Sequence, residues 1–265
     1  MRGTVRQRHG RSTVGVSWTP SISTSRTPEN LGDRQSAPCL YFPLGANVDR
    51  DIRELPRSGS VLVFGGGGLF YPAFYEAMQL AVETKPAKIV VWGAGANQHG
   101  KTRSEYPAWL ERCDLMGVRD YGTAHRWVPC ESCMHPELSR PIAPSHRIVI
   151  YCHATVPSNI TPLNGAPLLT NHASTMAEAI RFLGSGEFVQ TNTYHGMYWA
   201  TLLGRKVIVY PFSARHLFAK PRPTIATPDD KLEDLLSQPV SYPDALAECR
   251  DVNEKFYRDY QALFV

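Results

Sequence analysis

The chain has 265 residues, of which 43% are hydrophobic and 20% are charged, so its composition is that of an ordinary globular protein. No apolar run approaches the roughly twenty residues that a membrane-spanning helix needs, which argues against a transmembrane protein. The formal net charge of +4 reflects arginines in the first 26 residues, so no basic face for nucleic acid is indicated on the remainder.

Residues 1–27 are rich in Arg, Ser and Thr and have no apolar h-region. We expect a flexible basic N-terminal extension there rather than a secretory signal, because such a composition buries little surface. The six cysteines are scattered through core-forming sequence instead of being concentrated in a small scaffold. This usage favours a reducing compartment and therefore a cytoplasmic protein.

Short β-branched runs alternate with longer, helically spaced runs, which is the pattern of successive βα units. In the first half of the chain, the expected strands are 61–64, 88–92 and 115–118. The expected helices are 71–82, 105–112 and a further helix that begins near Asp120, a residue type suited to capping.

A proline-rich stretch over 129–144 interrupts this pattern, and a second set of units follows. The expected strands are 147–151, 187–190 and 206–210, and the expected helices are 174–183, 194–203, 229–236 and 243–263. The two sets predict an α/β fold of two Rossmann-like lobes with parallel sheets and a cleft between them, a GT-B-like arrangement. The N-terminal lobe is expected over 28–140 and the C-terminal lobe, with its terminal helices, over 141–265.

Glycines follow the first two of these strands, where small residues let a backbone approach a ligand. A helix start behind them favours an anion. The run contains no Lys for a P-loop and lacks dinucleotide spacing, so no cofactor is expected. A tight turn is the structural alternative. The substrate-binding candidates from these two turns are Gly66, Gly67, Gly68, Gly95 and Asn97.

Arg119 ends the third strand and offers a planar fork for a carboxylate or a phosphate, although a salt bridge with Asp120 would also explain it. A second polar cluster lies at a later strand-to-helix junction. There His195 is the side chain best suited to proton transfer near neutral pH, so we take His195 and Arg119 as catalytic candidates. The neighbouring substrate-binding candidates are Thr191, Asn192, Thr193 and Tyr194.

Cys130, Cys133 and His135 have the spacing of metal ligands within the proline-rich connection. A complete zinc site needs a fourth ligand or an open water position, and the candidates for that ligand in the sequence are Cys113, His125 and Cys152. Metal binding, redox chemistry and a purely structural role stay open for these three residues, and no metal site is assigned.

In their order along the chain, these motifs resemble the polysaccharide pyruvyl transferase family. The resemblance begins with the Asn-x-Gly-Asp of 30–33 and continues through the glycine run of 65–68, the Gly-x-Gly of 93–95 and the Val-Arg-Asp of 118–120. It ends with 191–196 and the helix and strand that follow, so that it covers about 30–211. The resemblance implies transfer of a pyruvyl group from phosphoenolpyruvate to two sugar hydroxyls as a ketal, with His195 as the acid or the anchor for phosphoenolpyruvate.

The chain departs from the family at one position, because the usual Thr-x-Arg-x-His has Thr193 in place of its Arg. The positive charge of the missing Arg could be supplied by another side chain, and the candidates are Arg119, Arg205, Lys206, Arg215 and His216. Two alternatives stay open at this stage: a nucleotide-sugar glycosyltransferase, and a non-catalytic carbohydrate-binding relative that stacks sugars on aromatic residues. A lipid-linked acceptor would add peripheral membrane contact, although the charged C-terminal helices resemble a solvated face.

Overall fold

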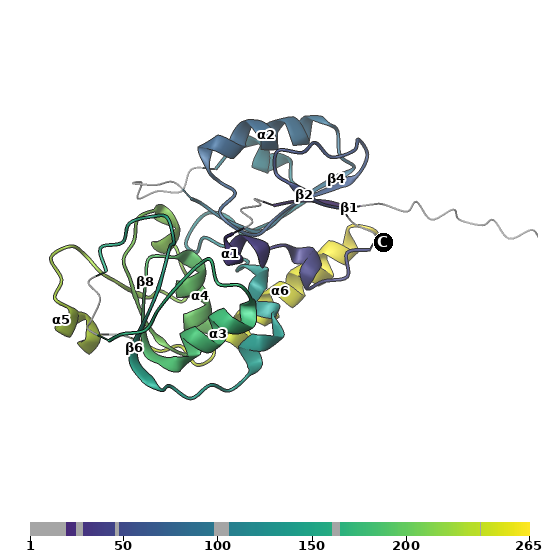
Figure 1. Ribbon diagram of the computed structural model, residues 1–265. Coiled ribbons are helices and arrows are strands. Elements are labelled where there is room, and N and C mark those ends of the chain that lie inside the picture. The colour runs from purple at the N-terminus through teal and green to yellow at the C-terminus, as the bar shows by residue number, and fades with distance from the viewer. Residues whose placement is uncertain (1–19, 25–28, 46–47, 98–105, 161–164, 239) are drawn as a thin grey trace, which may run out of the picture.

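The molecule contains two parallel five-stranded sheets, each in a lobe of its own (Figure 1). We describe residues 20–24, 29–45, 48–97, 106–160, 165–238 and 240–265 of the chain in a computed structural model. The expected α/β class with two Rossmann-like lobes and parallel sheets is confirmed. None of the helices in these ranges combines the length and the apolar character needed to cross a membrane.

The first sheet has the strand order β2-β1-β3-β4-β5, and all its pairings are parallel. Its strands are β1 (Pro20–Thr24), β2 (Val48–Asp51), β3 (Val61–Gly65), β4 (Lys88–Ala94) and β5 (Leu115–Val118). The α-helices of this part are α1 (Leu31–Arg34) and α2 (Pro72–Glu83), and the 3-10 helices are η1 (Pro38–Leu40) and η2 (Ala108–Arg112).

The second sheet has the strand order β10-β9-β8-β6-β7, again with parallel pairings. Its strands are β6 (His146–Cys152), β7 (Leu168–Thr170), β8 (Gly186–Thr191), β9 (Lys206–Val209) and β10 (Thr224–Ile225). The α-helices are α3 (Met176–Ser185), α4 (Tyr194–Leu202), α5 (Leu232–Ser237) and α6 (Ala245–Ala262). The 3-10 helices are η3 (Glu131–Met134) and η4 (Pro136–Ser139), which connect the lobes, and η5 (Ala214–His216).

Both faces of each sheet are covered, as the apolar strands of a parallel sheet require. Successive residues of β3 point to opposite faces. Leu62 and Phe64 pack in one cluster with Met78 of α2, whereas Val61 and Val63 pack in another with Phe256 of α6. In the second lobe, α3 and α4 cover one face of the sheet and α5 covers the other.

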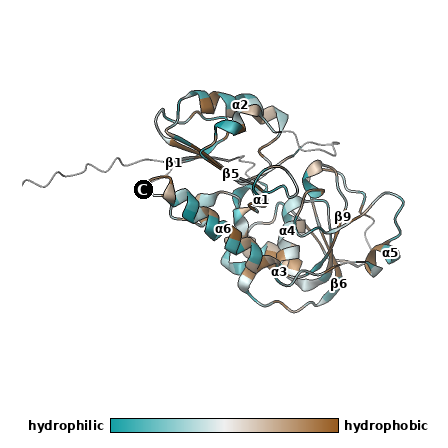
Figure 2. Ribbon diagram, turned by 180° about the vertical axis from the view of Figure 1, so that it is seen from behind, coloured by the Kyte–Doolittle hydropathy of each residue, from teal (hydrophilic) through white to brown (hydrophobic). Residues whose placement is uncertain are grey.

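Helix α6 packs against both lobes, and Figure 1 shows it running between them. Ala245 and Cys249 belong to the core of the second lobe, while Phe256 belongs to the core of the first. Between them, the buried Asn253 accepts a hydrogen bond from Trp92 Nε1 at 2.8 Å and donates one to the carbonyl of Pro129 at 3.0 Å. The hydropathy colouring of Figure 2 shows the mixture of polar and apolar residues on this helix.

Three local expectations differ from the structure. The helix expected over 105–112 is, within the described residues, the 3-10 helix η2. The extension expected over 1–27 contains β1 at Pro20–Thr24, a strand that pairs with both β2 and β3; residues 1–19 and 25–28 lie outside the described residues. The helix expected near Asp120 is wrong, because that carboxylate accepts hydrogen bonds from the backbone N–H of Ala96 at 2.6 Å and from Tyr106 at 2.8 Å. The chain after it forms a bridge back to Val118 instead.

Candidate functional site

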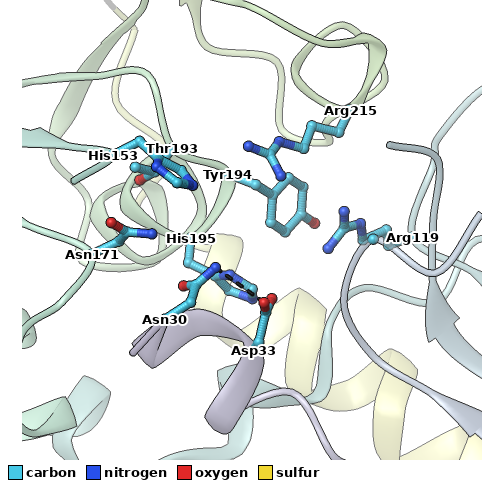
Figure 3. A pocket seen from close by; sticks show the side chains of 10 residues that line it. Asn30, Asp33, Arg119, His153, Asn171, Thr193, Tyr194, His195 and Arg215 are labelled. Atoms are coloured by element: carbon cyan, nitrogen blue, oxygen red, sulfur yellow. Dashed lines mark hydrogen bonds between the residues drawn. The ribbon is translucent and has the colours of Figure 1, made fainter. Parts of the chain in front are cut away.

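A narrow polar pocket lies between the lobes at the carboxyl ends of strands from both sheets (Figure 3). Its volume is about 20 Å³, room for roughly one water-sized group, and it opens into a wider cavity of about 480 Å³ with which it shares several residues. Ligands of open parallel sheets bind at this end of the strands. The residues that line the narrow pocket are Asn30, Asp33, Gly68, Arg119, His153, Asn171, Thr193, Tyr194, His195 and Arg215.

Arg119 enters the pocket directly from the end of β5. It is 3% exposed, and its guanidinium carbon lies 3.7 Å from the centre of the Tyr194 ring, so the two lobes meet in a cation–π contact. Gly95 makes room for it, because a Cβ at position 95 would lie 2.5 Å from Arg119 Cγ. The expected alternative, a salt bridge with Asp120, is not formed.

Arg215 reaches the same pocket from η5, which follows β9. Burial, together with the charge of Arg119, lowers the pKa of Arg215 to about 10. Within the described residues, the side chains of Arg119 and Arg215 form no ion pair, and the Nε atom of each is buried without a hydrogen-bond partner. Two unpaired guanidiniums in a buried pocket form a site for an anion.

The acids nearest Arg119 do not neutralise it fully. Burial raises the pKa of Asp120 above its usual range, against the lowering effect of Arg119. Burial also raises the pKa of Glu131 well above its usual range, and neither of its carboxyl oxygens has a hydrogen-bond partner in the described structure. The charge of Asp33, which also lines the pocket, opposes the lowering of the Arg215 pKa, so the pocket sets two guanidiniums against one lining carboxylate.

His195 lies in the first turn of α4 and is 8% exposed. Burial lowers its pKa well below the usual value, and the charges of Arg119 and Arg215 add to this effect. The imidazole is therefore neutral near pH 7 in the unliganded protein. Its Nε2 lies 3.6 Å from Cys130 Sγ, and its Nδ1 faces Gly32 of α1, where a Cβ would lie 2.0 Å away.

Three polar residues before His195 mainly shape the backbone. Thr191 Oγ1 accepts from the N–H of Thr193, and Thr193 Oγ1 caps α4 by accepting from the N–H of Gly196 at 2.9 Å. Asn192 Oδ1 accepts from the N–H of His153 and so holds the loop after β6. Of the three, Thr193 alone lines the pocket, together with Tyr194.

The candidate glycines also differ in whether they line the pocket or only shape the backbone. Gly66 and Gly67 have φ values of 64° and 72°, which favour glycine, and Gly66 packs against the carbonyl of Ser36. They form a tight turn and do not line either cavity, whereas Gly68 lines both. Asn97 lines the wider cavity, where its Oδ1 is buried without a hydrogen-bond partner in the described structure.

Of the cations that could compensate for Thr193, Arg119 and Arg215 line the same pocket as Thr193. The other cations proposed from the sequence are engaged elsewhere: Lys206 pairs with Glu187 at 3.0 Å, Arg205 donates to the carbonyl of Ile142, and His216 contacts the Ser213 carbonyl.

Sequence reasoning did not select four further pocket residues. Asn30 and Asp33 come from α1 and bond to each other at 3.1 Å, and their only signal was the Asn-x-Gly-Asp pattern. His153 directly follows β6, and Asn171 directly follows β7. The end of the strand expected over 147–151 was a usable signal for His153, whereas β7 was not expected and so gave none for Asn171.

The three residues at metal-ligand spacing have separate partners. Cys130 contacts His195, Cys133 Sγ lies 3.4 Å from Asn253 Nδ2, and His135 Nδ1 accepts from the N–H of Glu137. In the ranges given above, His, Cys, Asp and Glu side chains form no group of three or more that could hold a metal ion.

The comparisons with known proteins add little to this geometry. No protein-family model and no curated protein matches the chain. A similar solved structure, of an uncharacterized protein from Klebsiella pneumoniae, has 17% sequence identity and a TM-score of 0.49, with 80% of this chain and 94% of that chain covered. It says nothing about chemistry.

Proposed function

We propose that this protein is a pyruvyl transferase of the polysaccharide type, which moves the pyruvyl group of phosphoenolpyruvate onto a sugar or glycan. One observation carries the proposal: the unpaired Arg119 and Arg215 converge with the neutral His195 in one buried pocket between the lobes. Phosphoenolpyruvate has two anionic groups on a three-carbon frame. Two guanidinium forks that face a common space suit such a ligand.

The reaction requires a proton for the enol carbon and a place for the phosphate. One sugar hydroxyl attacks C2, C3 takes a proton to become the methyl group, the bond from C2 to the phosphate oxygen breaks, and a second hydroxyl closes the ketal. Of the two hydroxyl protons released, one balances the methyl group and the other leaves with phosphate. The arginines stabilise the negative charge that develops on the departing phosphate.

His195 is the proposed acid, and the ligand itself would charge it. Burial and two neighbouring guanidiniums keep the imidazole neutral in the free protein. Phosphoenolpyruvate brings negative charge that offsets the guanidiniums, which raises the pKa of His195 in the complex. Proton uptake would thus be coupled to binding, as general acid catalysis at neutral pH requires.

The wider cavity is the proposed place for the acceptor and for the part of phosphoenolpyruvate that the narrow pocket, with room for about one water-sized group, does not hold. It adjoins the arginines and presents Tyr71, Phe74 and Phe212 together with the amide of Asn97. Aromatic faces pack against sugar rings, and amides bond to hydroxyls. In this proposal the protein works in the cytoplasm with a GT-B-like arrangement and without a cofactor.

A turnover assay tests the proposal. The full-length protein is incubated with phosphoenolpyruvate and a panel of free, nucleotide-linked and lipid-linked sugars, and both phosphate release and a gain of the pyruvyl mass on the acceptor are measured. Phosphate release that depends on the acceptor and is lost in Arg215→Ala supports the proposal. The surface variant Arg222→Ala is the control, because Arg222 is exposed. Consumption of a nucleotide sugar instead would support the glycosyltransferase, and glycan binding without turnover would support the binding protein.

A further inference from the structure

Three fully buried groups lie in a row that ends at His195. Trp199 Nε1 lies 3.0 Å from Ser132 Oγ, Ser132 Oγ lies 3.2 Å from Cys130 Sγ, and Cys130 Sγ lies 3.6 Å from His195 Nε2. Trp199, Ser132 and Cys130 each have 0% exposed surface. Since no water reaches such groups, their hydrogens have to be paired among themselves.

The indole of Trp199 fixes the direction of this chain, because its N–H is a donor and never an acceptor. Ser132 Oγ therefore accepts from Trp199, and its own hydroxyl hydrogen has Cys130 Sγ as its acceptor among the described contacts. Cys130 Sγ accepts the hydroxyl hydrogen of Ser132, and its own S–H points to His195 Nε2. If His195 Nε2–H donated to the sulfur instead, the buried S–H of Cys130 would have no acceptor among the described contacts, so the direction toward Nε2 pairs more of the buried hydrogens.

We infer that Cys130 is a positioning residue that holds His195 in the tautomer with its proton on Nδ1, through the chain from Trp199 and Ser132. Nε2 is then the acceptor of the thiol hydrogen. Nδ1 lies on the α1 side of the ring, where Gly32 approaches it and where Asn30 and Asp33 line the pocket (Figure 3). Burial raises the pKa of Cys130 to about 11, which keeps the thiol hydrogen in place at neutral pH.

The tautomer follows from the hydrogen bonds alone, but its use rests on the proposed function. An imidazole in this form carries its proton on Nδ1 before any ligand arrives, so the ring keeps its orientation when phosphoenolpyruvate binds, and only the Cys130 thiol turns so that Sγ accepts from Nε2 once the imidazole is protonated. Preorganised donors of this kind are effective because no rearrangement is needed during the reaction. Loss of the thiol would then weaken ligand binding through His195, although Cys130 itself does not line the pocket.

Nitrogen-15 NMR of the full chain, labelled at its nine histidines, tests the tautomer directly. The His195→Gln variant identifies the signals of His195 by their loss. At pH 7 we expect Nδ1 of His195 to be protonated and Nε2 to be unprotonated in the unliganded protein. In Cys130→Ala we expect the form with the proton on Nε2 to become populated, and in Cys130→Ser, which keeps a donor, the Nδ1–H form to persist.

Cys133→Ala is the matched control, because Cys133 is equally buried, on the 3-10 helix that Cys130 precedes as N-cap, but contacts Asn253. It should leave the tautomer unchanged, which separates positioning from a general loss of packing. A proton on Nε2 in the wild type, or an unchanged Nδ1–H form in Cys130→Ala, would overturn the inference.

Binding of phosphoenolpyruvate is measured on the same proteins. We expect Kd to rise about tenfold in Cys130→Ala, to recover in Cys130→Ser and to stay unchanged in Cys133→Ala. The two claims fail separately. A wild type that does not bind phosphoenolpyruvate refutes the proposed function, while the NMR spectrum by itself still decides the tautomer.

Discussion

At the scale of single residues, several glycines are fixed by the side chains of other residues. Gly95 leaves space for Arg119, and Gly32 leaves space for His195. The sequence predicted Arg119, His195, Thr193, Tyr194 and Gly68 as site residues, and all five line one pocket. It named Arg215 only as one of five cations that could compensate for Thr193, because the position of that residue depends on how β9 and η5 pack beside β8, which no local pattern specifies.

The Gly32→Ala variant tests the space beside His195. A methyl group there would lie 2.0 Å from His195 Nδ1, so the imidazole has to move and phosphoenolpyruvate binding should fall at least tenfold. Gly32 lies in a helix, where alanine has the higher helix propensity. Propensity alone therefore predicts a more stable α1 in this variant and no loss of binding. Titration calorimetry checks the result, and unchanged affinity would contradict the account.

The Arg215→Lys variant tests whether a fork or only a charge is needed at that position. Lysine keeps the positive charge but loses the planar pair of donors. We expect the Kd for phosphoenolpyruvate to rise about ten- to hundredfold, since charge-assisted hydrogen bonds are lost. Arg222→Lys, on an exposed residue, is the control and should bind normally. Equal affinities for the two variants would show that Arg215 does not touch the ligand.

At the scale of elements, the prediction succeeded where apolar runs are long and failed where they are short. The buried strands β3, β4, β6 and β9 were expected within a few residues of their observed bounds. Strand β1 was missed, because its Pro-Ser-Ile-Ser-Thr sequence has one large apolar side chain and resembles a polar tail. The helix near Asp120 was wrong, because a residue suited to capping serves instead as a buried acceptor for Ala96 and Tyr106.

The link made by α6 yields a stability prediction. Asn253→Ala would leave Trp92 Nε1 without its acceptor and the Pro129 carbonyl without its donor, in a fully buried place. We expect the free energy of unfolding to fall by about 2–3 kcal/mol. Urea unfolding followed by tryptophan fluorescence measures it, with the exposed Glu254→Ala on the same helix as control. A loss equal to that of the control would mean that α6 does not join the lobes through this residue.

At the scale of the whole molecule, the site exists because two lobes bring their strand ends together. Arg119 comes from the first sheet, and His195 and Arg215 come from the second, so neither lobe holds the anion site alone. Helical periodicity predicted that α6 has an apolar face but not that this face is shared between lobes. The fold class was therefore readable from local patterns, whereas the assembly of the site was not.

The pH dependence of stability carries a signature of the buried histidines. Burial and the charge of Arg215 lower the pKa of His216 to about 3. Between pH 6.5 and about 3, His216 is protonated in the unfolded chain but not in the folded protein. The stability that His216 contributes is therefore lost as the pH falls toward about 3. In His216→Gln, the free energy of unfolding should therefore change less with pH than in the wild type, by about 1.4 kcal/mol per pH unit well below pH 6.5.

Urea denaturation of both proteins at several pH values between 7 and 5 measures this difference. Comparison with the variant is needed because Asp120 and Glu131, whose pKa values are raised, act in the opposite direction. Identical slopes for the wild type and His216→Gln would show that His216 is protonated in the folded protein.

The most direct test of the central claim is a calorimetric titration of the unliganded full-length protein with phosphoenolpyruvate in two buffers of different ionisation enthalpy. The account predicts binding, proton uptake by His195 on binding, and loss of both in the Arg119→Ala, Arg215→Ala double variant, whereas His195→Gln should lose the proton uptake and bind more weakly. No binding at millimolar phosphoenolpyruvate, or binding that survives removal of both arginines, would contradict it.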